Sequence, residues 1–400
     1  MNFSKLIQRV PTSSTIKMAQ MAREKRQAGK EVINLTLGEP DFPTPNFIVE
    51  AGAKALRDGF TKYTPVPGLL SLRKTISSKL STQNNLTYAP DEIIVSTGAK
   101  QSIANAVLTL VNPGEVVLLP VPYWVSYAGI AKMAGAEVFP MPTGIDQQFK
   151  ITPAQLESTL ASLSASGKVA KMLIFSSPSN PSGMCYSQEE LDALSTVIEK
   201  HASLWVLTDE IYEHINFTGK PHASIAKNQS IRDQVLLVNG MSKGYCMTGW
   251  RIGYLVGPKE VVKACGKLQG QFTSGTSAAA QKGAEAALLG SLDETLAMRD
   301  AFVQRRDYLL DALKDFKGWS YLKPDGAFYL FINIQEALGQ SINGKEITSG
   351  DGLAELLLDQ LDVALVGGSG FGEPNAMRIS YAASIEDLEV MVSRLAPYFS

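Results

Sequence analysis

Lys243 is the residue whose surroundings point most directly to chemistry. It lies just past the apolar run 235–238, which predicts a buried strand, so its amine stands near a strand end. The active sites of open α/β sheets gather at such ends. Burial there lowers the pKa of a lysine and makes it a nucleophile that forms Schiff bases. Ser242 and Arg251 offer a hydroxyl and a guanidinium that suit a phosphate.

Polar residues follow two other predicted strands. Asp209 closely follows the apolar run 204–207, with Tyr212 three residues later. Asn180 lies in the segment 177–183, which follows another such run. We expect these side chains at the same sheet edge as the lysine. Considered alone, Asp209 also fits a helix N-cap. The segment 177–183, considered alone, also fits a plain turn.

The elements that position these residues alternate between strands and helices. Short apolar runs rich in Val, Ile and Leu suit a parallel sheet that is buried on both faces. They cover 92–96, 116–119, 172–175, 204–207, 235–238 and 252–256. The clearest helical pattern is 188–201, and Ser187 and Glu190 have capping-box spacing at its start. We expect a large doubly wound α/β domain over residues 45–297.

The remaining residues, 1–44 and 298–400, predict a smaller α+β domain. Its expected helices are 16–28, 292–316 and 385–398, and we expect helix 292–316 to bridge the two domains. Its expected strands are 328–332, 363–366 and 377–381. Three prolines between residues 38 and 45 predict an extended, ordered loop.

The composition excludes several classes of protein. The 400 residues carry 37 basic and 39 acidic side chains, a net charge of −2, which excludes binding nucleic acid through a basic surface. No apolar run reaches the roughly 18 residues of a membrane span, and residues 1–26 lack the apolar core of a signal peptide. We therefore expect a cytoplasmic enzyme. Three cysteines and three histidines, without ligand spacing, predict no disulfide scaffold and no metal site.

Two glycine-containing motifs do not support other enzyme classes. Residues 240–244 match G-x-S-x-G, the nucleophile elbow of α/β-hydrolases, but that fold needs its histidine after the serine. All three histidines precede Ser242. The glycine-rich segment 367–372 lacks the G-x-G-x-x-G spacing of dinucleotide-binding loops, so we expect a turn between strands there.

In combination, these residues resemble the class I, fold-type I pyridoxal-phosphate aminotransferases, and more narrowly the bacterial aspartate aminotransferase subgroup Iβ. Each motif is weak alone, but their order and spacing are specific, and they span nearly the whole chain. The matching segments are 38–42, 62–65, 98–101, 122–127, 179–183, 209–213, 242–243, 247–254 and 378–381. The resemblance implies an α/β fold: a mostly parallel sheet domain plus a smaller α+β domain.

The resemblance also implies roles for the residues at the strand ends. Lys243 would bind pyridoxal phosphate covalently and then move a proton on the substrate. Asp209 would pair with the protonated ring nitrogen of the cofactor, which makes the ring an electron sink. Tyr212 and Asn180 would hydrogen-bond the phenolic oxygen of the ring, and Trp124 would stack on its face.

The phosphate of the cofactor would lie at the N-terminus of a helix that begins near Gln101. By resemblance, its ligands are Gly98, Ala99, Lys100, Ser242 and Arg251. Tyr63 would reach the phosphate of a neighbouring subunit, which implies a homodimer with shared active sites.

Substrate binding is assigned in the same way. Arg378 would clamp the α-carboxylate of the substrate beside Gly38, next to Trp124 and Asn180. Lys100 would bind the distal carboxylate of a diacid. A polar N-terminal segment with Ser13 and Thr15 would close over the substrate. These roles predict a ping-pong aminotransfer between L-aspartate and 2-oxoglutarate, an amino acid and a 2-oxo acid.

Three alternatives stay open at this point. The first is an aromatic or prephenate aminotransferase with the same cofactor residues, although many such relatives carry a lysine where this chain has Val10 or Pro11. The second is a fold-related lyase, such as a C–S lyase. The third, a regulator with a DNA-binding domain ahead of the cofactor motifs, is disfavoured because those motifs begin at Gly38.

Overall fold

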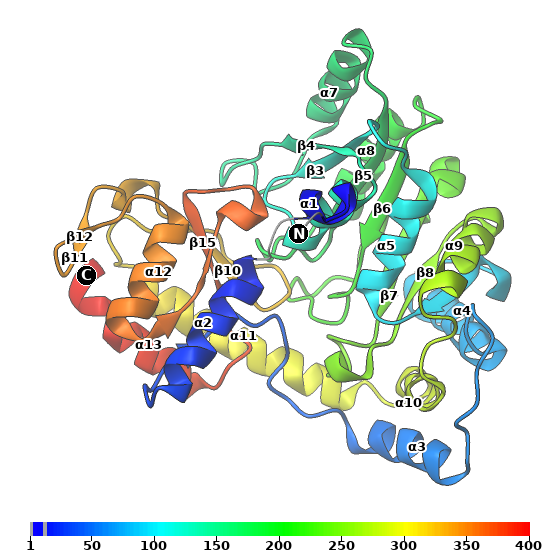
Figure 1. Cartoon of the computed structure of the whole chain (residues 1–400), viewed down its shortest axis with the longest axis horizontal. Coiled ribbons are helices and arrows are strands. Elements are labelled where there is room, and N and C mark those ends of the chain that lie inside the picture. The colour runs from blue at the N-terminus through cyan, green and yellow to red at the C-terminus, as the bar shows by residue number, and fades with distance from the viewer. Residues whose placement is uncertain (1–2, 11–13) are drawn as a thin grey trace.

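A seven-stranded sheet forms the centre of the larger part of the chain. The computed structural model describes residues 3–10 and 14–400 (Figure 1). The strand order is β2-β8-β7-β6-β5-β3-β4, and every neighbouring pair is parallel except those of β8 with β2 and β7. The strands are β2 (Ile93–Ser96), β3 (Val116–Pro120), β4 (Glu137–Met141), β5 (Ala170–Ser176), β6 (Trp205–Asp209), β7 (Val235–Gly240) and β8 (Gly253–Val256). The predicted mostly parallel α/β sheet is confirmed.

Helices cover both faces of this sheet, which is why its strands read as continuous apolar runs. Alternate residues of β5 enter different cores: Leu173 and Phe175 pack on one face, Met172 and Ile174 on the other. The helices of the first face are α3 (Asn46–Arg57), α4 (Leu70–Asn84), α7 (Pro153–Ala165), α8 (Gln188–Ile198) and α10 (Ala278–Leu289). Those of the second are α5 (Ala99–Leu110), α6 (Val125–Met133) and α9 (Lys259–Phe272).

Apart from the cores on the two faces of the larger sheet, a separate hydrophobic core surrounds a four-stranded antiparallel sheet of order β14-β15-β10-β9. The strands are β9 (Ser320–Tyr321), β10 (Tyr329–Asn333), β14 (Val366–Gly367) and β15 (Ala376–Ser380). The helices around this core are α2 (Ser14–Gln27), α11 (Asp293–Leu313), α12 (Gly350–Leu361) and α13 (Ile385–Phe399). In Figure 1, α11 extends from the side of α10 to the side of α13.

The predicted strand 363–366 is divided, so this expectation was wrong in detail. β13 (Val363–Ala364) pairs with β1 (Ile33–Asn34), whereas β14 pairs with β15. The chain changes its partner sheet at Leu365. The other short elements are α1 (Lys5–Arg9), β11 (Ser341–Ile342), β12 (Lys345–Glu346), η1 (Pro90–Glu92), η2 (Ile225–Lys227), η3 (Gln229–Gln234), η4 (Thr248–Trp250), η5 (Gln335–Ala337) and η6 (Ser369–Phe371).

Candidate active site

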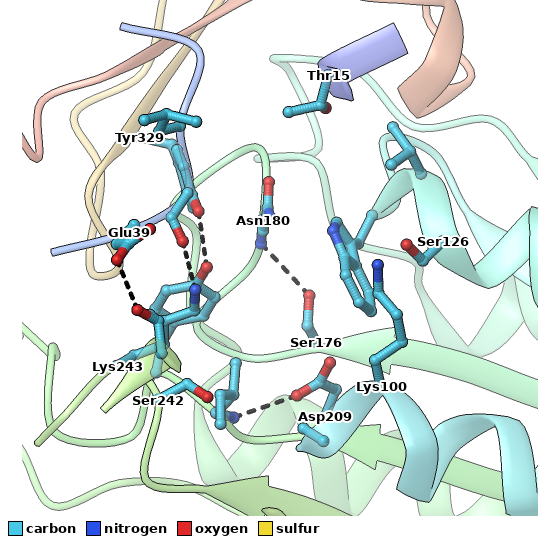
Figure 2. Close-up of a pocket in the computed structure, with 18 of the residues that line it drawn as sticks. Thr15, Glu39, Lys100, Ser126, Ser176, Asn180, Asp209, Ser242, Lys243 and Tyr329 are labelled. Carbon is cyan, nitrogen blue, oxygen red and sulfur yellow. Dashed lines mark hydrogen bonds between the residues drawn. The ribbon is translucent and has the colours of Figure 1, made fainter. Parts of the chain in front are cut away.

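A cavity of about 300 Å³ lies beyond the carboxyl ends of β5, β6 and β7, between the seven-stranded sheet and the four-stranded sheet (Figure 2). Most of the residues that we predicted as site residues line it: Thr15, Gly38, Ala99, Lys100, Trp124, Asn180, Asp209, Tyr212, Ser242, Lys243, Arg251 and Arg378. Gly98, the N-cap of α5, is not among the lining residues, although it directly precedes Ala99. Tyr63 is 98% exposed and lies outside the cavity. Ser13 falls outside the described residues.

The Lys243 amine stands in this cavity, three residues beyond the end of β7. Its Nζ donates a hydrogen bond to the Gly38 carbonyl oxygen. Burial lowers the pKa of Lys243 to about 8; Glu39 opposes this shift and the Arg378 guanidinium adds to it. About a tenth of this amine is therefore neutral, and thus nucleophilic, at pH 7, far more than for an ordinary lysine.

Asp209 is the last residue of β6, and its buried carboxylate lies at the floor of the cavity (Figure 2). Its Oδ2 accepts from the Tyr127 hydroxyl at 2.8 Å, and its Oδ1 accepts from the Ile211 amide at 3.2 Å. Burial raises the pKa of Asp209 to about 6, although both hydrogen bonds favour the ionised form. A cation placed beside this carboxylate would stabilise its ionised form further.

Buried ion contacts behind the cavity hold the segment after β6 in place. Asp209 and Tyr212 line the cavity, whereas the buried carboxylates of Glu210 and Glu213 do not. Glu210 accepts a hydrogen bond from the Ser224 hydroxyl. Glu213 pairs with Lys79 of α4. Burial alone would raise the pKa of Glu213, but the Lys79 ammonium holds it below its ordinary value. Breaking such a pair would leave an uncompensated buried charge, so the segment is anchored firmly.

Arg378, on β15, is fully buried beside the cavity. Its Nη1 donates to Asn180 Oδ1 at 2.9 Å and its Nη2 to the Thr36 carbonyl oxygen at 2.6 Å. Its Nε is buried and has no hydrogen-bond partner among the described residues. A buried guanidinium with unused donor capacity fits a carboxylate ligand, because carboxylates accept from the planar fork of arginine.

The N-terminus of α5 forms an anion cradle with Arg251. The helix begins at Ala99 rather than near Gln101, with Gly98 as its N-cap at φ +81°. A Cβ on Gly98 would collide with the Arg251 guanidinium, so the glycine permits this close approach. The helix N-terminus presents free amide groups and a positive dipole end, and Ser242 adds a hydroxyl. This set of donors fits a phosphate.

Lys100 and Trp124 both line the cavity. In Figure 2, Lys100 lies on the side of the cavity away from Lys243. The Lys100 Nζ is 5.0 Å from the centre of a Trp124 ring. Burial lowers the pKa of Lys100, and the positive charge of Arg251 lowers it further. Thr15, from the first turn of α2, also lines the cavity.

Sequence reasoning missed several polar residues of the site. Tyr127 holds Asp209, and Tyr329 bonds to Tyr212 at 2.8 Å between their hydroxyl oxygens. Glu39 accepts from the Thr248 hydroxyl at 2.6 Å. All of these lie in segments that the sequence had marked as motifs or strands, but their types alone gave no signal that they face the cavity.

Other kinds of site find no support in the described ranges, 3–10 and 14–400. Within them, no group of three His, Cys, Asp or Glu residues could hold a metal ion. Nor does any helix there combine the length and apolar character needed to cross a membrane.

Comparisons with known proteins agree with this geometry. The family described as aminotransferase class I and II matches residues 30–395. The chain belongs to this family. This aminotransferase is 44% identical to the bifunctional aspartate aminotransferase and glutamate/aspartate-prephenate aminotransferase of Petunia hybrida, over 98% of the chain and 82% of the relative. It is 39% identical to the aspartate aminotransferase of Bacillus subtilis, over 99% of the chain and 98% of that relative.

Solved structures extend the comparison to the fold. The aspartate aminotransferase of Rhizobium meliloti matches with a TM-score of 0.94 and 36% identity, over 100% of this chain and 98% of that one. The aspartate aminotransferase of Thermus thermophilus with maleate matches with a TM-score of 0.90 and 34% identity, over 100% of both chains. The aminotransferase therefore has the predicted α/β fold of type I.

Proposed function

We propose that this aminotransferase uses pyridoxal phosphate to transfer the amino group of L-aspartate to 2-oxoglutarate by a ping-pong mechanism, giving oxaloacetate and L-glutamate. The observation that carries the proposal is the convergence of Lys243, Asp209 and Arg378 on one cavity that also contains an anion cradle. The names of the relatives agree with this choice of substrates.

The residues of the cavity suit the cofactor in charge and hydrogen-bonding capacity. The phosphate would bind at the α5 N-terminus with Ser242 and Arg251. Asp209 would face the ring nitrogen, and Trp124 would cover the ring. When bound, pyridoxal phosphate supplies an electron sink that stabilises negative charge at the α-carbon of the substrate.

The protein's own residues would bind the substrate and move its proton. Lys243, with its pKa lowered to about 8 by burial, would take a proton from the α-carbon and return it to the cofactor. Asp209 would keep the ring nitrogen protonated. Arg378 would bind the α-carboxylate, and Lys100 the distal carboxylate of a diacid with four or five carbons.

The assembly belongs to the same proposal. Residues 1–44 with 298–400 would act as a small domain that closes on residues 45–297 and excludes water. Tyr63, exposed in the single chain, would reach the phosphate site of a second copy, so that a cytoplasmic homodimer shares its sites. The predicted role of Ser13 in closure remains part of this proposal.

The first test is the absorbance spectrum of the purified holoprotein before and after addition of L-aspartate. We expect a visible band that disappears as a shorter-wavelength band of the amino form grows, with oxaloacetate released. Conversion of the band by phenylalanine or arogenate but not by aspartate would overturn the assignment of aspartate as the amino donor. Release of pyruvate and ammonia would indicate a lyase. The lack of any visible band after reconstitution with pyridoxal phosphate would overturn the proposed cofactor assignment.

Prephenate is a second candidate substrate, because relatives are named for it and because apolar side chains stand at the cavity wall. Ile16 and Leu37 line the cavity while remaining 62% and 47% exposed. These side chains would suit the ring of such a substrate.

Lys100→Ala separates recognition of the distal carboxylate from the shared chemistry. We expect kcat/KM for aspartate to fall about 100-fold, the value of one charge-assisted hydrogen bond, with phenylalanine turnover within about threefold of wild type. Lys74→Ala, at an exposed position of α4, is the matched control and should change neither. Equal loss with both substrates would contradict the assigned role.

A further inference from the structure

Tyr329 contacts both the residue expected to bind the substrate carboxylate and the residue expected to bind the cofactor ring. Its hydroxyl oxygen lies 2.8 Å from that of Tyr212. The Arg378 guanidinium lies over the face of its ring, 4.4 Å from the centre. Figure 2 places Tyr329 on the same wall of the cavity as Glu39 and Lys243.

The surroundings of Tyr329 fix the direction of its hydroxyl. The residue begins β10 and is fully buried, and its ring packs edge-on against Tyr212 with 5.8 Å between centres. A Cβ on Gly38 would lie 2.5 Å from the Tyr329 oxygen, so the glycine leaves room for it. Within the described residues, Tyr212 is the recorded hydrogen-bond partner of this hydroxyl.

Hydrogen-bond directions follow from the number of protons. Tyr212 has one hydroxyl proton to donate. If it donates that proton to the phenolic oxygen of the cofactor, its own oxygen must accept from Tyr329. The two hydroxyls then form a chain from Tyr329 to Tyr212 to the cofactor, and such chains polarise their members cooperatively.

We propose that Tyr329 is a positioning residue that couples occupancy of the α-carboxylate site at Arg378 to the hydrogen bond that Tyr212 donates to the cofactor. This inference rests on the proposed function. Because the Arg378 cation lies over the Tyr329 ring, the Tyr329 hydroxyl is a stronger hydrogen-bond donor. A carboxylate bound to Arg378 neutralises that cation, so Tyr329 polarises Tyr212 less and the phenolic oxygen is stabilised less. The Lys243 nitrogen that binds the cofactor would then hold its proton more tightly, because the less stabilised phenolic oxygen attracts that proton more strongly.

The test is a pH titration of the visible absorbance of the holoenzyme, with and without maleate, a dicarboxylate that has no amino group. Maleate should raise the wild-type midpoint. In Tyr329→Phe, we expect the midpoint without maleate to rise by about half a pH unit, or about threefold in proton affinity, the value of a modest hydrogen bond. We also expect a smaller increment on addition of maleate.

Two comparisons show whether Tyr329 acts through Tyr212. The double variant that combines Tyr212→Phe with Tyr329→Phe should titrate like the Tyr212→Phe variant alone. The loss of the Tyr212 hydroxyl already breaks the chain of hydrogen bonds to the cofactor. Tyr381→Phe is the matched control: this tyrosine is equally buried, and its hydroxyl bonds to the Ala327 carbonyl oxygen instead. It should leave both the midpoint and the maleate increment unchanged.

The outcomes separate the inference from the proposed function. Unchanged titrations in Tyr329→Phe, or additive shifts in the double variant, would overturn the inference while the wild-type response to aspartate still supports the function. A wild type without a visible band would overturn both. If the phenylalanine variant fails to fold, 3-fluorotyrosine at position 329, a stronger donor of nearly the same shape, should lower the midpoint; no shift would overturn the coupling.

Discussion

Lys243→Ala is expected to lower kcat for aminotransfer by about 10⁴-fold or more, because it removes the group that moves the proton and the amine that binds the cofactor. The amine projects into the cavity, where burial lowers its pKa to about 8. The Glu39 and Arg378 side chains that influence it remain in the variant, but neither offers a neutral amine. Single-turnover measurement of oxaloacetate from aspartate checks this directly.

Two variants control for charge and for general disturbance. Lys243→Arg keeps a positive charge but supplies no nucleophilic amine, so it should be as inactive as the alanine variant. Lys263→Ala alters an exposed lysine of α9 and should behave as wild type. Residual activity of the alanine variant above a few per cent of wild type would show that another group moves the proton.

The sequence predicted most of the sheet because its strands are buried on both faces. Such strands are short apolar runs bounded by turn residues, a pattern that can be recognised locally. Strand β4 (Glu137–Met141) escaped this test because it contains a glutamate and Pro140 and lies at the edge of the sheet. The capping box of Ser187 and Glu190, also a local signal, was confirmed at the start of α8.

The contacts inside the site could not be predicted in the same way. The bond between Tyr127 and Asp209 joins residues 82 positions apart, and that between Tyr212 and Tyr329 joins residues 117 positions apart. Sequence motifs identified Asp209 and Tyr212 because each follows a strand end. They gave no reason to select the partners Tyr127 and Tyr329, since a buried tyrosine of a helix or strand has the same sequence appearance whether its hydroxyl faces a cavity or not. The packing of the hydrophobic cores against one another decides that question.

Asp209→Asn is expected to lower kcat about 10³-fold, since it removes one preorganised charge that stabilises the reacting centre. The carboxylate ends β6 and is held by Tyr127 and the Ile211 amide, so it is aimed into the cavity before any ligand binds. Burial raises its pKa to about 6, although Tyr127, the Ile211 amide and the Lys243 cation oppose this shift. A protonated ring nitrogen beside it would reverse that shift and in turn be held protonated. An asparagine amide preserves the shape of the side chain but carries no negative charge to hold the ring nitrogen protonated.

The cofactor itself provides the control for this interpretation. Pyridoxal phosphate methylated at the ring nitrogen carries a permanent positive charge, so it should restore part of the activity of Asp209→Asn while giving no gain to wild type. Tyr127→Phe removes one hydrogen bond from the carboxylate and leaves its charge, so we expect about a tenfold loss, at the low end for a hydrogen bond to a charged group. If the methylated cofactor restores nothing, the carboxylate acts by orientation rather than by charge. That result would also remove the reason for a carboxylate at the floor of the cavity, where burial alone disfavours its ionised form.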